Sequence, residues 1–239
     1  LGFLTFVTQS FAFMNIEAIR QRQERGFLGR VGISINGDSG NTENFNGKAS
    51  TINDYKKGDE EYILLGDYKY GESFNDAIEH FGNLHLRYAK SFKNFPTFEY
   101  FVQGEFNEFT RINSRFLTGP VLRHKIFDEK KHSLFLGTGI YYERESIDDA
   151  DINKTTRANT YISYLYQLRK GLDFSLISYF QPSLEQGSDY WLIVDTGLSF
   201  ELNRFISYGF EVNYFHDNDP PTDVKRDDLS YHTGLTITY

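Results

Sequence analysis

The dominant pattern from residue 27 to the end of the chain is an alternation of apolar and polar residues. A period of two places successive side chains on opposite faces of a β-strand. The last segment shows it most clearly, because one parity carries Leu229, Tyr231, Thr233, Leu235, Ile237 and Tyr239. The other parity carries Ser230, His232, Gly234, Thr236 and Thr238. The pattern predicts an all-β protein whose strands have two chemically different faces.

The same alternation recurs along the chain and predicts about twelve strands, with 10 and 14 as the alternative numbers. No helical pattern intervenes, so we expect neighbouring strands to pair as antiparallel hairpins. The predicted strands cover residues 27–37, 43–55, 61–71, 78–89, 97–109, 112–126, 132–145, 155–168, 171–182, 190–202, 204–216 and 228–239.

Two further features favour a membrane barrel over a soluble sandwich of two sheets. The polar parity carries charges such as Glu99 and Glu105, which a sandwich core would not tolerate but which suit the interior of a transmembrane barrel. The links after odd-numbered strands are often longer than those after even-numbered ones, as expected for external loops and periplasmic turns. We therefore predict a single antiparallel transmembrane β-barrel over residues 27–239, with outward aromatic side chains at the membrane interfaces.

The first 26 residues do not follow the alternation. Residues 1–12 are apolar and uncharged and end in small residues at the expected cleavage positions, so we interpret them as the remnant of a signal peptide. A short buried strand or helix is the alternative. Residues 13–26 carry a helical pattern, with Ile16 and Ile19 on one face, and predict a periplasmic segment, a plug of the barrel or a frayed leader.

Composition narrows the functional classes. The chain of 239 residues is 17% aromatic, has a formal net charge of −8 and contains no cysteine. Its mean hydropathy of −0.50 and the absence of an apolar run of about 18 residues exclude a helical membrane protein. The missing cysteines exclude a disulfide scaffold and a cysteine zinc site, and the acidic balance argues against a nucleic-acid partner.

The polar parity gives the candidate site, a lumen with seven basic and eight acidic side chains. A balanced lumen favours cross-strand ion pairs that brace the barrel, or a narrow channel of weak ion selectivity. Within one predicted hairpin, Glu99 and Glu105 are expected to face Arg115 and Arg123. The wider set is Arg30, Lys48, Lys69, Arg87, Arg115, Arg123, Arg157, Asp67, Glu99, Glu105, Glu143, Asp173, Asp195, Glu201 and Glu211.

The remaining charges separate between the two kinds of link. The predicted external loops are acidic, with Glu145, Asp148, Asp149, Asp151, Asp217 and Asp219 among their residues. The predicted periplasmic turns are basic, with Lys56, Lys57, Lys90, Lys93, Lys130, Lys131, Arg169 and Lys170. One hypothesis is that divalent cations link the acidic loops to lipopolysaccharide phosphates. The spacing matches no calcium-loop motif, so the alternative is a solvated acidic rim.

Motifs for catalysis are sparse. The six histidines are scattered, and no metal-protease, hydrolase, phosphate-loop or dinucleotide-binding motif occurs. We predict no cofactor, no metal and no catalytic residue. A lipid-modifying barrel enzyme is the remaining catalytic hypothesis, with His80 or His124 facing lipid and Ser91 or Ser114 at nearby strand ends.

Three segments resemble a known family. Residues 37–42 (GDSGNT) are similar to an SGNT element after the first strand of the YdiY-like, salt-induced outer membrane proteins (domain of unknown function 481). Residues 214–221 (YFHDNDPP), with Lys225, Asp227 and the later Thr233-Gly234-Leu235, resemble the closing hairpin of that family. The resemblance, which also includes Asn15-Ile16-Glu17, covers roughly residues 15–239. It implies a bacterial outer-membrane β-barrel without an established biochemical role.

These observations predict an outer-membrane barrel with both termini in the periplasm. The favoured role is a narrow channel or an envelope-integrity protein linked to salt or osmotic stress. The alternatives are a structural barrel that docks an unidentified envelope protein, and a lipid-modifying enzyme. The expected partners are outer-membrane lipid, lipopolysaccharide and, during biogenesis, the barrel assembly machinery. That machinery would read a C-terminal signal formed by Tyr231, Leu235, Ile237 and Tyr239.

Overall fold

The structure is a computed structural model that describes residues 16, 20, 26–40, 43–93, 95–147, 152–203 and 206–237. The predicted signal remnant, most of the helical segment, Asp148, Asp149, Asp151 and Tyr239 lie outside the described residues. Ile16 and Arg20 are helical and buried. No helix among the described residues is long and apolar enough to cross a membrane.

Twelve strands form one sheet in sequence order, from β1 to β12. Every pair whose register is described is antiparallel, namely the pairs from β1 to β5 and those from β8 to β12. The strands are β1 (Gly26–Asp38), β2 (Asn44–Lys57), β3 (Glu60–Ser73), β4 (Asp76–Phe92), β5 (Phe95–Asn107), β6 (Ile112–Asp128), β7 (His132–Ile147), β8 (Asn153–Arg169), β9 (Leu172–Pro182), β10 (Tyr190–Glu201), β11 (Ile206–Asp217) and β12 (Asp227–Ile237).

All twelve predicted strands are present. Their ends lie within about three residues of the predicted ones, the usual uncertainty of boundaries read from a pattern. One element was not predicted, the short 3-10 helix η1 (Glu108–Thr110) between β5 and β6. The side chain of Asn107 caps η1 by accepting a hydrogen bond from the amide of Phe109, and Arg111 ends it in the left-handed region with a φ of 61°. An alternation of apolar and polar residues does not reveal such local hydrogen bonds, so η1 was not predicted.

The links between strands follow the predicted lengths with one exception. The loops at residues 183–189 and 218–226, after β9 and β11, are long, and the turns after β2 and β8 are tight. The link after β3 is also a tight turn, although it lies at the end with the longer loops. It consists of Phe74 and Asn75, with φ angles of 51° and 65°. Two consecutive left-handed residues are the geometry of a two-residue hairpin turn.

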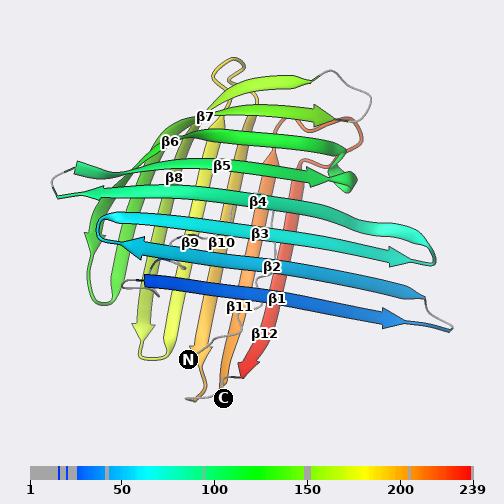
Figure 1. Ribbon diagram of the computed structural model, residues 1–239, viewed down its shortest axis with the longest axis horizontal. Coiled ribbons are helices and arrows are strands. Elements are labelled where there is room, and N and C mark those ends of the chain that lie inside the picture. The colour runs from blue at the N-terminus through cyan, green and yellow to red at the C-terminus, as the bar shows by residue number, and fades with distance from the viewer. Residues whose placement is uncertain are drawn as a thin grey trace. The chain divides into compact units, whose positions relative to one another are not determined.

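The chain divides into two compact units. The N-terminal unit contains Gln23–Pro120 and Ile140–Thr156, and the C-terminal unit contains Val121–Gly139 and Arg157–Tyr239. In Figure 1, β1 to β5 lie side by side as consecutive hairpins coloured blue to green. Strands β9 to β12 do the same in the C-terminal unit, coloured yellow to red.

The two faces of the strands differ sharply in chemistry. The apolar face exposes large hydrophobic side chains, including Val31 and Ile33, each 75% exposed, and Leu86 at 49%. The opposite face, called here the charged face, buries polar side chains such as Glu99 and Gln103, both 0% exposed. It consists of the even-numbered residues of β1, β2 and β12 and the odd-numbered residues of β3 to β11. The charged face also buries hydrophobic side chains such as Ile63, Leu117 and Ile193. The strands differ from those of a soluble protein in their exposed apolar face and in the charges buried on the other face.

Glycine on the charged face makes room for a large ring. A Cβ on Gly137 of β7 would overlap the ring of Tyr161 on β8, and both residues belong to the C-terminal unit. Tyr161 is 2% exposed and packs against Tyr179 of β9 with ring centroids 5.2 Å apart. The absence of a side chain at Gly137 therefore lets two tyrosine rings pack between neighbouring strands.

Candidate functional site

The charged face of the N-terminal unit carries a chain of hydrogen-bonded polar residues on β4 and β5. Arg87 donates to Glu99 at 2.8 Å, and its Nε donates to Nε2 of His85 at 3.3 Å. The other ring nitrogen of His85 lies 2.7 Å from Oε1 of Gln103. Since Nε2 accepts, we assign the ring proton to Nδ1. The His85 ring also stacks on Phe101, at 5.6 Å between centroids.

The chain continues to a buried arginine on β6. Gln103 donates to Oε2 of Glu105 at 2.9 Å, and Arg115 donates to Oε1 of the same carboxylate at 2.8 Å. Arg115 also forms ion pairs with Glu143, at 3.5 Å, and with Glu145. One guanidinium thus contacts three carboxylates, and each of the four side chains is at most 7% exposed.

The four residues predicted to form one cluster, Glu99, Glu105, Arg115 and Arg123, have different partners from those expected. Glu105 does contact Arg115, but Glu99 pairs with Arg87 of the neighbouring strand. The guanidinium of Arg123 lies over the ring of Phe135, 3.7 Å from its centroid. Parity identifies the face of a residue but not its partner, because partner choice depends on stagger between strands and on side-chain length.

Two other predicted lumen residues have contrasting environments. Asp195 of β10 is 8% exposed and accepts a hydrogen bond from Nδ2 of Asn213 at 2.9 Å. Glu211 of β11 is exposed. Glu145, expected in an external loop, is a buried residue of β7, because this strand extends to Ile147.

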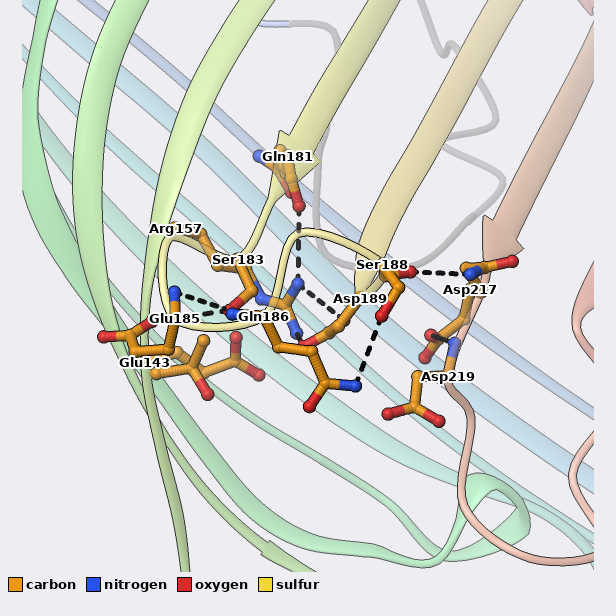
Figure 2. Close-up of polar contacts among 12 residues, drawn as sticks. Glu143, Arg157, Gln181, Ser183, Glu185, Gln186, Ser188, Asp189, Asp217 and Asp219 are labelled. Atoms are coloured by element: carbon orange, nitrogen blue, oxygen red, sulfur yellow. Dashed lines mark hydrogen bonds and ion pairs between the residues drawn. The ribbon is translucent and has the colours of Figure 1, made fainter.

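A buried arginine also fixes a loop in the C-terminal unit. Arg157 of β8 forms a bidentate ion pair with Asp189, with both N–O distances at 2.9 Å. Its guanidinium lies 4.2 Å from the ring centroid of Trp191 and donates to the carbonyl of Gln181 at 3.4 Å. Figure 2 shows the loop of residues 183–189 curving around this guanidinium. We call this loop the β9–β10 loop.

The β9–β10 loop is also bonded internally and to the next loop. The hydroxyl of Ser183 accepts from the amides of Glu185 and Gln186, at 3.2 and 3.0 Å (Figure 2). The side chain of Asn218 donates to the carbonyl of Ser188 at 2.6 Å. The long loops after β9 and β11 are therefore bonded to each other, which the sequence did not predict.

Two acidic residues predicted in the last external loop lie at its beginning. Asp217 ends β11 and is 8% exposed, and its Oδ1 accepts from the amide of Asp219 at 2.9 Å. This bond forms an Asx turn, in which the Asp217 side chain accepts from the backbone two residues further on. Among the described residues, no group of three or more His, Cys, Asp or Glu side chains is arranged to hold a metal ion. The structure thus gives no support to the divalent-cation hypothesis within those residues.

The basic turns are accompanied by acidic partners. Lys56 contacts Glu61 at 3.1 Å, and Lys90 contacts Glu60 at 3.3 Å. Glu60 follows directly after the tight turn, outside the stretch expected to cross lipid. Hydrogen bonds from Lys90 and then from Tyr88 hold the pKa of the Glu60 carboxyl below its usual value of 4.5. Lys56 and Lys90, two of the eight basic residues predicted in these turns, are therefore each paired with a carboxylate.

His80, one of the two histidines proposed for lipid chemistry, lies among aromatic rings. Nδ1 of His80 is 2.8 Å from Glu108, and its ring packs against Tyr68, Tyr70 and Phe106 at 5.1 to 6.1 Å between centroids. None of these partners is a serine. Ser91 lies eleven positions further along the same strand, roughly 36 Å away in extended backbone. The predicted histidine–serine pair on β4 is therefore not assembled.

The predicted C-terminal signal is described only in part. Tyr231 lies on the apolar face of β12 and is 73% exposed. Leu235 and Ile237 belong to the same strand, but their side chains and Tyr239 lie outside the described part of the chain.

Comparison with known families identifies the family of this chain. The family model described as "Protein of unknown function, DUF481" matches residues 31–239. The chain belongs to the DUF481 family. The family suggested by the GDSGNT and YFHDNDPP segments is thereby confirmed. No curated protein matches this DUF481 chain.

Solved structures resemble the DUF481 chain in fold. A structure described as the NanC porin is 10% identical, with a TM-score of 0.53 over 88% of this chain and 99% of the porin chain. A structure described as a bacterial polysaccharide outer membrane secretin is 9% identical, with a TM-score of 0.48 over 89% and 91% of the two chains. At 10% identity the likeness to the porin concerns the fold alone, and it confirms the predicted antiparallel barrel class.

Proposed function

We propose that this DUF481 protein is an outer-membrane β-barrel that acts as a narrow ion-conducting channel. The observation that carries the proposal is the apolar face of large exposed hydrophobic residues, together with charged residues that are buried on the other face alongside hydrophobic ones. Lipid is the solvent in which such an apolar face is stable, and a hydrated lumen is the environment that suits the charged face.

The same reasoning requires the sheet to close. Lipid offers no hydrogen-bond partner to an unpaired strand edge, so β12 would pair with β1. With an even number of strands, both termini then lie on one side, which we assign to the periplasm. The described strands are 11 to 17 residues long, enough for a tilted crossing that needs about 9–11 residues.

The ion pairs on the charged face support a narrow lumen. Arg87, Arg115 and Arg157 each extend a long side chain to carboxylates on other elements. Side chains that bridge strands in this way occupy the interior, so a pore between them would be narrow. The alternative of a sealed structural barrel in an envelope assembly differs in one measurable property, since it would not conduct.

A conductance measurement tests the proposal. Purified protein refolded in detergent should migrate faster on an unheated gel than after boiling, as closed barrels do. Added to a planar lipid bilayer in about 1 M KCl, where the Debye length is about 3 Å, it should give discrete conductance steps. A heat-modifiable barrel without steps would refute the channel, and a freely soluble monomer without a heat-dependent shift would refute the barrel.

The link to salt stress implied by the family resemblance is part of the proposal. A deletion strain is expected to grow more slowly than its parent after a shift to high salt, and restoration by the intact gene would support the role. Equal growth of both strains would contradict it. Outer-membrane lipid, lipopolysaccharide and the barrel assembly machinery remain the proposed partners.

A further inference from the structure

We infer that Arg144 and Lys154 bind the phosphate groups of lipopolysaccharide on the apolar face of the barrel. This site rests on the proposed outer-membrane location, with the longer links on the outer side, and it does not depend on ion conduction. It assigns residues and a ligand chemistry to one of the partners proposed above. Both residues belong to the N-terminal unit.

The two residues are cations on a face that is otherwise apolar. Arg144 of β7 and Lys154 of β8 are exposed, and their parity places both on the apolar face. Arg144 stands between Glu143 and Glu145 in the sequence. These two carboxylates lie on the charged face and contact Arg115 instead. Among the described residues, no ion pair includes Arg144 or Lys154. A lone cation is costly on a lipid-facing surface, so we expect this pair to lie where an anion compensates it.

The register of the two strands places the cations opposite each other. The amide of Gln167 on β8 donates to the carbonyl of Lys131, directly before β7, at 2.6 Å. Arg144 lies thirteen residues after Lys131. Lys154 lies thirteen residues before Gln167, so an unbroken antiparallel register pairs it with Arg144. The overlap of a glycine and a tyrosine described above for β7 and β8 fits the same register. Like charges directly opposite each other on a sheet repel, and a bound anion would replace this repulsion with two attractions.

The pair lies where β7 leaves its apolar stretch. From the turn end towards the loop end, the apolar face of this strand carries Leu134, Leu136, Thr138, Ile140 and Tyr142. This stretch of nine residues matches the length of about 9–11 residues that a strand needs to cross the hydrocarbon core. Arg144 is the next residue on the same face, three residues before β7 ends at Ile147. We therefore expect the cations at the level of the lipid headgroups, where a charge costs little.

The neighbouring side chains suit a ligand with both acyl chains and phosphate. Arg115 contacts Glu145 across β6 and β7, and the same register places Phe116 opposite Arg144. Phe116 and Tyr142 are exposed and offer an apolar surface to acyl chains. A guanidinium binds phosphate through two parallel hydrogen bonds, and the lysine adds a point charge. Basic side chains at a membrane surface recognise lipid phosphates by this chemistry.

Binding of lipid A, the phosphorylated and acylated anchor of lipopolysaccharide, tests the inference. The wild-type barrel, refolded in a non-ionic detergent, is titrated with lipid A, and native mass spectrometry gives the Kd. Lipid A without its phosphates should bind more weakly, and inorganic phosphate should not displace lipid A because it lacks acyl chains. Arg144→Gln should weaken the binding of lipid A roughly tenfold, and Arg144→Gln/Lys154→Gln roughly 100-fold, since each lost charge removes a charge-assisted hydrogen bond.

The matched control is the double variant Lys57→Gln/Lys93→Gln. Both lysines are exposed cations of the same unit at the turn end of the strands. The variant therefore loses the same total charge away from the proposed site, and it should bind lipid A as the wild type does. The heat-dependent gel shift establishes that each variant is folded. If Arg144→Gln does not fold, Lys154→Gln provides the test, with the same loss of roughly tenfold.

The possible failures are distinguishable. Equal binding of lipid A by the wild type and by folded Arg144→Gln/Lys154→Gln would overturn the inference and leave the proposed barrel standing. The same holds if the lysine control weakens binding as much, or if phosphate-free lipid A or inorganic phosphate binds as tightly as lipid A. A freely soluble wild-type monomer without a heat-dependent shift would overturn the barrel and the lipid site together.

Discussion

Removal of the Arg157 guanidinium is expected to destabilise the end of the C-terminal unit that carries the β9–β10 loop. Its side chain is 4% exposed and that of Asp189 is 14% exposed, so both charges are largely removed from water. Arg157→Gln leaves the Asp189 carboxylate without its bidentate partner and removes the cation from the Trp191 ring. The variant therefore tests how strongly the β9–β10 loop is held.

Breaking a buried ion pair by removing one partner costs about 3–5 kcal/mol, because the remaining charge stays desolvated. Asp189 retains some access to water, so we expect the lower end, about 3 kcal/mol, for Arg157→Gln. The double variant Arg157→Gln/Asp189→Asn removes both charges together. It should therefore cost less than the sum of the single changes, with a coupling of about 2 kcal/mol.

The chain contains its own probe for this experiment. Trp191 is the single tryptophan, and the guanidinium lies over its ring. Urea unfolding of the barrel in lipid vesicles, followed by Trp191 fluorescence, gives the free energy of unfolding of each variant. Lys154→Gln is the control, because Lys154 is an exposed cation on the same strand and its loss should change stability by less than about 0.5 kcal/mol.

Two results would refute the reasoning. If Arg157→Gln is as stable as Lys154→Gln, the ion pair contributes nothing after its desolvation cost. Alternatively, the two single changes could add without coupling, which would show that Arg157 and Asp189 act on stability through other contacts.

Three further changes test the packing, the apolar face and the turn charges. Gly137→Ala should destabilise the barrel by about 1–3 kcal/mol in urea unfolding, because its methyl group overlaps the Tyr161 ring; Gly104→Ala, with no atom near the new Cβ, should not. Leu86→Arg should cost about 2–4 kcal/mol in lipid vesicles if the apolar face meets the bilayer core. Stability unchanged by that arginine would contradict a lipid contact. The lowered pKa of Glu60 means that its ionised form stabilises the fold above about pH 4.5 and that this contribution is lost as the pH falls through the lowered value. The urea midpoints of wild type and Glu60→Gln should therefore converge below pH 4, and a constant difference down to pH 2 would contradict this sign.

The fold could be predicted from the sequence because it depends on one repeated pattern. A strand with one lipid-facing and one charged side has a period of two, and a one-residue error would place Leu86 and Arg87 on the wrong faces. The pairing of residues across a hairpin can also be predicted, because a tight turn fixes the register. The turn after β4, for example, places His85 opposite Gln103. The charge pattern does not indicate this pair, because neither His85 nor Gln103 carries a formal charge that would suggest a partner.

The partners of Arg115 and Arg157 could not be predicted in this way. Glu145 is 30 residues from Arg115, and Asp189 is 32 residues from Arg157. Both contacts depend on how far β7 extends and on how a loop without periodicity folds back. An alternation pattern contains no information on either property. The acidic residues near strand ends were therefore assigned to solvent, although Glu145 is buried.

Arg87, Arg115 and Arg157 are buried on the charged face, and their being arginines has a consequence for its packing. A guanidinium has five donors in a fixed plane and stays charged, so it can hold carboxylates from two strands at once. Arg87, Arg115 and Arg157 are thereby engaged in ion pairs with Glu99, Glu105 and Asp189. In the N-terminal unit these pairs connect neighbouring strands, and in the C-terminal unit the pair fixes the β9–β10 loop to β8. The three arginines thus determine the packing of the charged face within each unit.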